Sequence, residues 1–191
     1  MSSISALAWS SERLSALTAA LCLLLLPAAA AAKVFHSQSE ALELAFPDAE
    51  RIDSRTFVLD DEQTARIETL SRSAVDSKLV KIYTGMRDGA VLGYAVIDVH
   101  TVRTHSQAFM VVLTPEGAVR SLRVLAFHEP LDYLPNGRWY EQFDRKTADA
   151  PLRVGGDVHG IVGATLSASA TTRGVRRALA FYQVLIREGE S

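Results

Sequence analysis

Cysteine is almost absent from this 191-residue chain, and the single one, Cys22, lies inside an apolar N-terminal run. If that run is removed, the remaining chain can form no disulfide, no thiolate nucleophile and no cysteine-based metal site. The chain also lacks a basic excess, since its formal net charge is −2, and this argues against a nucleic-acid-binding surface. Hydrophobic and charged residues make up 48% and 22%, the proportions of an ordinary globular protein.

The N-terminal run Leu14–Ala32 contains no charged residue, follows Arg13, is interrupted by Pro27 and ends in alanines. A positive flank, an apolar centre and a small-residue end are typical of a signal peptide, predicted here for residues 1–32 with cleavage near its end. The alternative is an uncleaved membrane anchor, because the run is about as long as a short spanning helix. Either way, residues 33–191 are expected to be exported as one domain.

The middle of the chain is rich in β-forming residues and predicts an antiparallel meander of about four strands. Asp88-Gly89 is typical of a hairpin turn, and residues 114–117 (TPEG) form a second turn signal. A further short strand is expected at 56–59, and residues 128–157 are expected to form a partly packed loop. The four main strands are expected at residues 79–84, 90–99, 108–113 and 118–127.

Helical spacing of apolar residues appears in three places, so the predicted fold class is α+β, an antiparallel meander packed with helices. Two helices are expected before the sheet, at Ser39–Phe46 and Asp60–Ser73. The last helix is amphipathic, with Ser167 as its expected N-cap and Gly189 just past its end. Its apolar face is formed by Val175, Ala178, Leu179, Tyr182, Leu185 and Ile186.

The turn Gly163-Ala164-Thr165 comes directly before this last helix. A helix N-terminus offers unpaired N–H groups and the positive end of the helix dipole, and small residues allow close approach of a phosphate. The turn is therefore a candidate phosphate site. The alternative is a glycine turn and a capped helix without any ligand.

Around this turn the sequence reads HGIVGATLSASATTRGVRRAL, which resembles the attachment motif of the FMN-binding domain family. The family includes the covalent-flavin subunits of the Rnf and Na+-translocating NADH:quinone oxidoreductase complexes and stand-alone exported proteins. The resemblance covers about residues 40–187, including YTGMRDGAVLGYAV, TPEGAVRSLRVLAFHEP with a family glutamate at Glu129, and WYEQF.

The resemblance implies an exported electron-transfer protein rather than a free-standing enzyme. FMN would be linked by a phosphoester to Thr165, and a flavin transferase that uses FAD as donor would attach it. Membrane or periplasmic redox proteins would be its other partners. The implied cofactor-binding residues are Thr165, Ala164, Gly163, Leu166, Ser167, Val162, His159, Glu129 and His128.

Two positions depart from the family pattern, which is roughly Asp-x-x-Ser/Thr-Gly-Ala-Thr. His159 stands where the family has Asp, and Val162 stands where it has Ser or Thr; Asp157 lies two residues too early. These departures favour an alternative function, a binding or scaffold module that keeps the fold and holds FMN without a covalent bond or holds none.

Other kinds of site find little support in the sequence. His100, His105, His128 and His159 show no paired ligand spacing, so no metal site is predicted. The serines of the last helix have no evident partner base for a hydrolase. The aromatic residues Trp139, Tyr140 and Phe143 are expected to pack in the core, with stacking on a flavin as the alternative, and Tyr133 and Leu134 could border the flavin ring.

Overall fold

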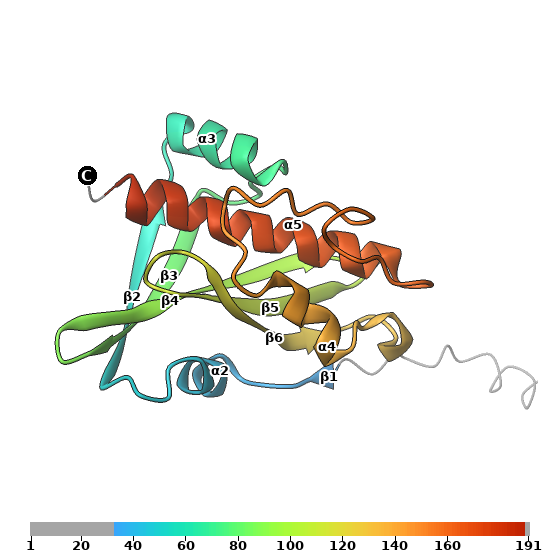
Figure 1. Ribbon diagram of the computed structural model, residues 1–191, viewed down its shortest axis with the longest axis horizontal. Coiled ribbons are helices and arrows are strands. Elements are labelled where there is room, and N and C mark those ends of the chain that lie inside the picture. Colours follow the sequence, from blue (N-terminus) through green and yellow to red (C-terminus); the bar gives the residue numbers. More distant parts are fainter. Residues whose placement is uncertain (1–32, 190–191) are drawn as a thin grey trace, which may run out of the picture. The chain divides into compact units, whose positions relative to one another are not determined.

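The computed structural model describes residues 33–189, so the predicted signal peptide lies outside the described residues. Its centre is a six-stranded antiparallel sheet with the strand order β1-β6-β5-β4-β3-β2 (Figure 1). The strands are β1 (Lys33–Val34), β2 (Arg51–Val58), β3 (Leu79–Arg87), β4 (Ala90–Thr101), β5 (Ser106–Leu113) and β6 (Val119–Phe127).

The predicted meander is confirmed as strands β3 to β6, each of which pairs with the next along the chain. Asp88 and Gly89 form the tight β3–β4 turn with positive φ angles of 49° and 75°, as a two-residue hairpin requires. Two strands lie outside this meander: the short strand predicted at residues 56–59 corresponds to the end of the longer β2, and β1 was not predicted. β1 and a longer β2 extend the meander at its two edges.

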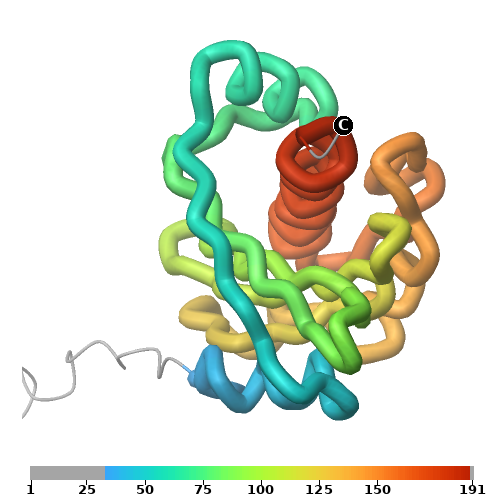
Figure 2. The backbone as a smooth tube through the Cα atoms, turned by 90° about the vertical axis from the view of Figure 1, so that its left-hand side faces the viewer, coloured from blue at the N-terminus to red at the C-terminus, as the bar shows by residue number. Residues whose placement is uncertain are grey.

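Helices cover both faces of this sheet. Helix α3 (Asp61–Ser71) and helix α5 (Thr165–Tyr182) lie together over one face, and helix α2 (Gln38–Ala45) lies on the other (Figures 1 and 2). The apolar face predicted for the last helix is entirely buried. It packs in the larger core with Val96, Phe109 and Val111 of the sheet.

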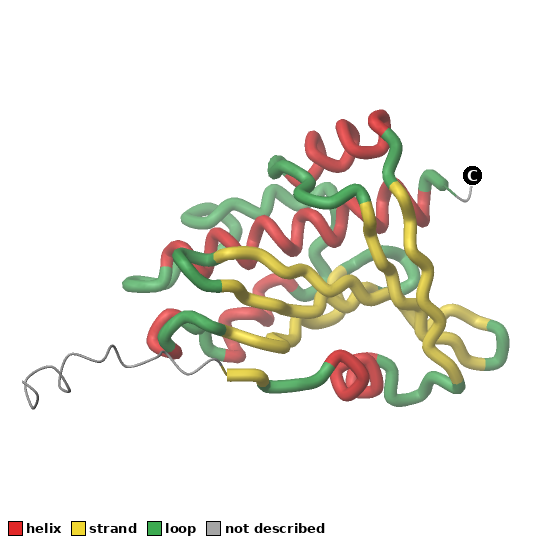
Figure 3. The backbone as a smooth tube through the Cα atoms, turned by 180° about the vertical axis from the view of Figure 1, so that it is seen from behind, coloured by secondary structure: helices red, strands yellow, loops and turns green. Residues whose placement is uncertain are grey.

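Two predicted helices start close to where the sequence placed them. Ser37 caps α2 in a capping box with Glu40, and Asp60 caps α3 in the same way with Gln63. The predicted loop after β6 contains short helical turns: η1 (Leu131–Tyr133), α4 (Gly137–Tyr140) and η2 (Glu141–Phe143). A π-helical turn, η3 (Gln183–Arg187), continues α5. Figure 3 shows the strands of the sheet between α2 and the pair of helices α3 and α5.

A buried ion pair joins α5 to the sheet. Both Nε and one terminal nitrogen of Arg177 donate to Asp98 of β4, at 2.9 and 2.7 Å. The other oxygen of Asp98 lies 2.5 Å from Nδ1 of His100. This pair fixes α5 on the sheet, and Arg103 of the β4–β5 connection lies at the same pocket as the N-terminus of α5.

Candidate functional site

The N-terminus of α5 has no side-chain cap. The predicted cap Ser167 is wrong: Ala164 occupies the N-cap position, Thr165 is the first helical residue, and none of the described side chains accepts a hydrogen bond from the helix start. Gly163 turns the chain into the helix with φ of +81°, a conformation that favours glycine. Because an alanine cap supplies no oxygen, the first N–H groups of α5 stay available.

A pocket of about 390 Å³ lies at this helix start. Five residues of the implied cofactor site line it: Gly163, Ala164, Thr165, Leu166 and Ser167. Two more lining residues, Arg103 and Tyr133, come from elsewhere in the chain. The pocket volume is within the range of ordinary ligand sites, roughly 300–1,000 Å³.

Arg103 is the lining residue that the sequence did not reveal. It lies in the short connection between β4 and β5, and its guanidinium carbon is 4.7 Å from the centre of the Tyr133 ring, a cation–π contact. The side chain of Arg103 forms no ion pair with any residue between 33 and 189. The pocket therefore combines a helix N-terminus with a cation that has no acidic partner.

Glu129 holds the connection that carries Arg103. Its Oε1 accepts hydrogen bonds from the backbone N–H groups of Arg103, Thr104 and His105, at 3.0, 2.7 and 2.9 Å. Burial of Glu129 by itself raises the pKa, but the three N–H groups outweigh it and lower the pKa from 4.5 to about 2. The carboxylate is thus charged at neutral pH, and it acts on the loop rather than lining the pocket.

Ser167 and Thr165 both line the pocket, and their hydroxyl groups are in different environments. Ser167 is 1% exposed, and its Oγ has no hydrogen-bond partner among the described residues. A buried hydroxyl without a partner is costly, so an acceptor or donor from a ligand would stabilise it. Thr165 is exposed, and its Oγ1 makes only a long contact of 3.4 Å to the carbonyl of Ile161.

The remaining implied residues, Val162, His159 and His128, do not line the pocket. Val162 is fully exposed, and the backbone of His159 donates to Gln142 and accepts from Trp139, both at 2.7 Å. Nδ1 of His128 contacts Ser106.

Asp157 is the acidic residue nearest in sequence to position 159, where the family pattern has aspartate, and its carboxylate already has other partners. Asp157 accepts from the N–H groups of Leu152 and Arg153 and pairs with Lys146. It therefore stabilises its own turn and does not replace the family aspartate at position 159.

The three aromatic residues before the motif pack against one another, as expected for core residues. Trp139 makes edge contacts with Tyr140 and Phe143, with ring centres 5.3 Å apart in each case. Phe143 is completely buried and belongs to the main core. Of the candidates for bordering a ring, only Tyr133 lines the pocket at the helix start.

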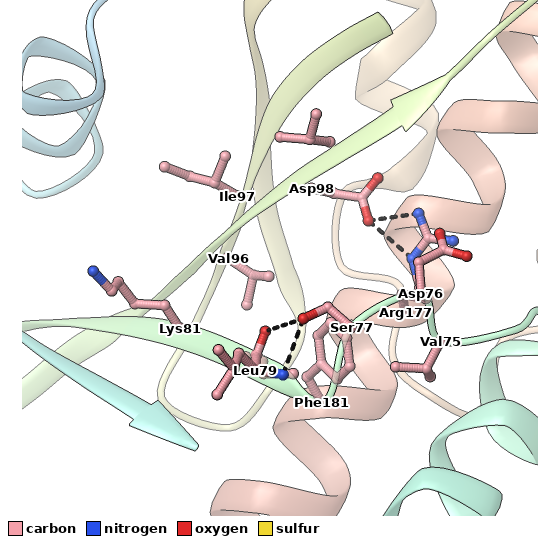
Figure 4. A pocket seen from close by; sticks show the side chains of 12 residues that line it. Val75, Asp76, Ser77, Leu79, Lys81, Val96, Ile97, Asp98, Arg177 and Phe181 are labelled. Carbon is pink, nitrogen blue, oxygen red and sulfur yellow. Dashed lines mark hydrogen bonds and ion pairs between the residues drawn. The ribbon is translucent and has the colours of Figure 1, made fainter. Parts of the chain in front are cut away.

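A second cavity, of about 150 Å³, lies farther along α5 (Figure 4). Its charged centre is already paired, since Arg177 points at Asp98. Ser77 is also satisfied, because its hydroxyl bonds to the backbone of Leu79. Asp98, Arg177 and Ser77 in this cavity are therefore already bonded within the protein.

Residues 33–189 contain no cluster of three or more His, Cys, Asp and Glu side chains suited to a metal ion. Over the same residues, no helix combines the length and apolar character needed to cross a membrane.

Comparison with known proteins confirms the fold. No protein-family model and no curated protein sequence matches the chain. Among solved structures, the fold is similar to the crystal structure of Shewanella oneidensis NqrC. The TM-score is 0.53, the sequence identity is 13%, and the match covers 81% of this chain and 90% of NqrC. The chain has an NqrC-like α+β fold.

Proposed function

We propose that this protein is an FMN-carrying electron-transfer protein, with the flavin held at the N-terminus of α5. The observation that carries the proposal is the pocket in which the Gly163-Ala164-Thr165 turn, an uncapped helix start and Arg103 meet. The NqrC-like fold supports it, because the resembled family includes covalent-flavin subunits of the Na+-translocating NADH:quinone oxidoreductase (Nqr) complexes.

The residues present fit a flavin phosphate. Backbone N–H groups at the start of α5 and the helix dipole favour an anion there. The unpartnered Ser167 hydroxyl can donate to a phosphate oxygen, and Arg103 supplies a full positive charge at the same pocket. When bound, the flavin would supply the electron chemistry, while the protein binds and orients it.

Covalent attachment through Thr165 is the finer part of the proposal. Thr165 is exposed, its hydroxyl is held by only one long contact, and it lines the pocket, so a transferase can reach it. In the transfer from FAD, an Oγ1–P bond to the FMN half forms, the pyrophosphate bond breaks, and AMP leaves with the threonine proton. The other proposed partners are redox proteins in or beside the membrane.

Export is also part of the proposal and is supported by the sequence alone. The uncharged run Leu14–Ala32 behind Arg13 is typical of a signal peptide. A flavoprotein delivered by such a segment would work in the periplasm or on the outer side of the inner membrane.

The flavin-free alternative remains a second candidate because of two residues. His159 and Val162 differ from the family pattern that a flavin transferase recognises, and Val162 is fully exposed where such an enzyme would approach. A scaffold or a non-covalent flavin carrier would keep the same fold.

The proposal is tested by measuring whether flavin remains attached to the chain after denaturation. The full chain is coexpressed with its host's flavin transferase, denatured, and separated on a gel, and in-gel flavin fluorescence is measured. We expect fluorescence for the wild type and none for Thr165→Val, which keeps the shape but removes the hydroxyl. Fluorescence retained by Thr165→Val would show that the attachment site is another residue.

A matched control uses another threonine with the same local geometry. Thr69 is an exposed residue of α3 whose Oγ1 donates to the carbonyl four residues earlier, at 2.8 Å, as Thr165 does to Ile161. Thr69→Val should retain full fluorescence. Colour that is present in the native protein and lost on denaturation would identify non-covalent flavin, and no colour in either state would favour the scaffold.

A further inference from the structure

Arg103 differs from the pocket residues of the helix start because it comes from the connection between β4 and β5. Its side chain is exposed and rests on the Tyr133 ring at 4.7 Å. No carboxylate between residues 33 and 189 pairs with it. A guanidinium without an acid partner, lining a pocket, is suited to bind phosphate through two parallel N–H groups.

The position of this arginine is fixed by a carboxylate that itself stays outside the pocket. One oxygen of Glu129 accepts the three consecutive N–H groups of Arg103, Thr104 and His105. Its other oxygen lies 3.6 Å from Nδ1 of His105. Because hydrogen bonds to a charged acceptor are strong, they hold the backbone of the connection in one conformation.

A second and independent observation points to a ligand at the same place. Ser167 is one of the residues that line the pocket, and its buried hydroxyl has no hydrogen-bond partner among residues 33–189. Buried hydroxyls without partners are uncommon in folded proteins. A phosphate oxygen in the pocket would satisfy this hydroxyl and meet Arg103 at once.

We infer that Arg103 is the residue that recognises the flavin phosphate and so selects phosphorylated flavin over riboflavin, with Glu129 as its positioning residue. The inference rests on the proposed function, since it assigns a specificity determinant to the same pocket. Glu129 acts through the loop: it holds Arg103 toward the pocket without lining the pocket itself. The ring of Tyr133 supports the guanidinium of Arg103, which lies over the face of the ring.

The test compares two flavins that differ only in the phosphate. The full chain is produced without a flavin transferase, and FMN and riboflavin are each titrated into it while flavin fluorescence is followed. We expect wild type to bind FMN more tightly than riboflavin by about tenfold or more, the effect of one charge-assisted contact. Arg103→Gln should remove that preference by weakening FMN alone, and Arg103→Lys should retain part of it.

The positioning role has its own signature. Glu129→Gln should reduce the FMN-to-riboflavin ratio of affinities by less than Arg103→Gln does, and the double variant should match Arg103→Gln because the two residues act as one unit. A merely structural role for Glu129 would weaken both flavins equally. The control is Arg138→Gln, an exposed arginine of α4 that does not line the pocket and should leave the ratio unchanged.

The outcomes separate this inference from the proposed function. If FMN binds and Arg103→Gln keeps the wild-type preference for FMN, the assignment of Arg103 is wrong while the flavin site stands. If neither flavin binds the wild type, the role of Arg103 in recognising the flavin phosphate is overturned, while covalent flavin at Thr165 is judged separately by in-gel fluorescence after coexpression with the transferase.

Discussion

Asp98 and Glu129 are both buried carboxylates with lowered pKa values, but they are held by different kinds of partner. The carboxylate of Asp98 is hydrogen-bonded to two side chains, Arg177 of α5 and His100 of its own strand. Glu129 meets three backbone N–H groups of one loop. The first therefore fixes a helix on the sheet, and the second fixes a loop at the pocket. Asp98 should matter most for stability, and Glu129 for binding.

The largest expected effect comes from breaking the Asp98–Arg177 pair. Arg177→Met leaves a buried carboxylate without its cation, and such a change costs about 3–5 kcal/mol of unfolding free energy. Urea unfolding followed by circular dichroism would measure it. Arg51→Met is the matched control, because its ion pair with Asp53 is exposed and should contribute little to stability. Equal losses in the two variants would contradict the structural role of the buried pair.

The next largest effect is the pH dependence of the unfolding free energy that Glu129 causes at acidic pH. A pKa lowered from 4.5 to about 2 means that its contribution to stability is complete above pH 4.5 and is lost as the pH falls toward 2. Glu129→Gln should therefore be less stable than wild type at pH 6, with the difference narrowing between pH 4.5 and 3. Unfolding free energies at several pH values would show this. A difference that stays constant with pH would argue against a charged Glu129.

A surface carboxylate provides the reference for that pH series. Glu43→Gln changes an exposed side chain of α2 and should track the wild type throughout. The pKa of Asp98 is also lowered: burial alone would raise it, but the contacts with His100 and Arg177 outweigh burial. Asp98 is unchanged in these variants, so it contributes equally to the acid sensitivity of each.

The smallest effect is expected at the turn into α5. An alanine at position 163 would meet no atom within 4 Å, so its cost is the left-handed backbone alone, about 1–2 kcal/mol. Gly163→Ala should lower the melting temperature modestly and reduce flavin loading. Gly137→Ala is the control, since it too meets nothing within 4 Å but has no positive φ, and it should change neither property.

Much of the fold follows from patterns that are local in the sequence. The β3–β6 meander and the buried face of α5 were predictable because apolar periodicity directly reports burial. β2 was predicted only in part, since most of this edge strand is exposed and it pairs through its backbone with β3. β1 has two residues, too few to leave a pattern.

The site was predictable only where it is continuous in the sequence. The turn at residues 163–165 carries a motif, so its place before the helix could be predicted. Ser167 was wrongly expected to be the cap because serine favours that position, whereas the turn at Gly163 starts the helix earlier. Arg103 left no signal: its place depends on backbone N–H groups that bind a glutamate 26 positions away. Glu129 itself could be found only through the family resemblance.

The intact mass of the protein tests the central claim most directly. The exported chain is purified after coexpression with its host's flavin transferase, weighed, and digested to locate any added group. We predict an added mass equal to an FMN phosphoester on the peptide that contains Thr165, absent in Thr165→Val. A mass equal to the bare chain, under conditions in which a known acceptor of the same transferase is fully loaded, would contradict covalent flavin at this site.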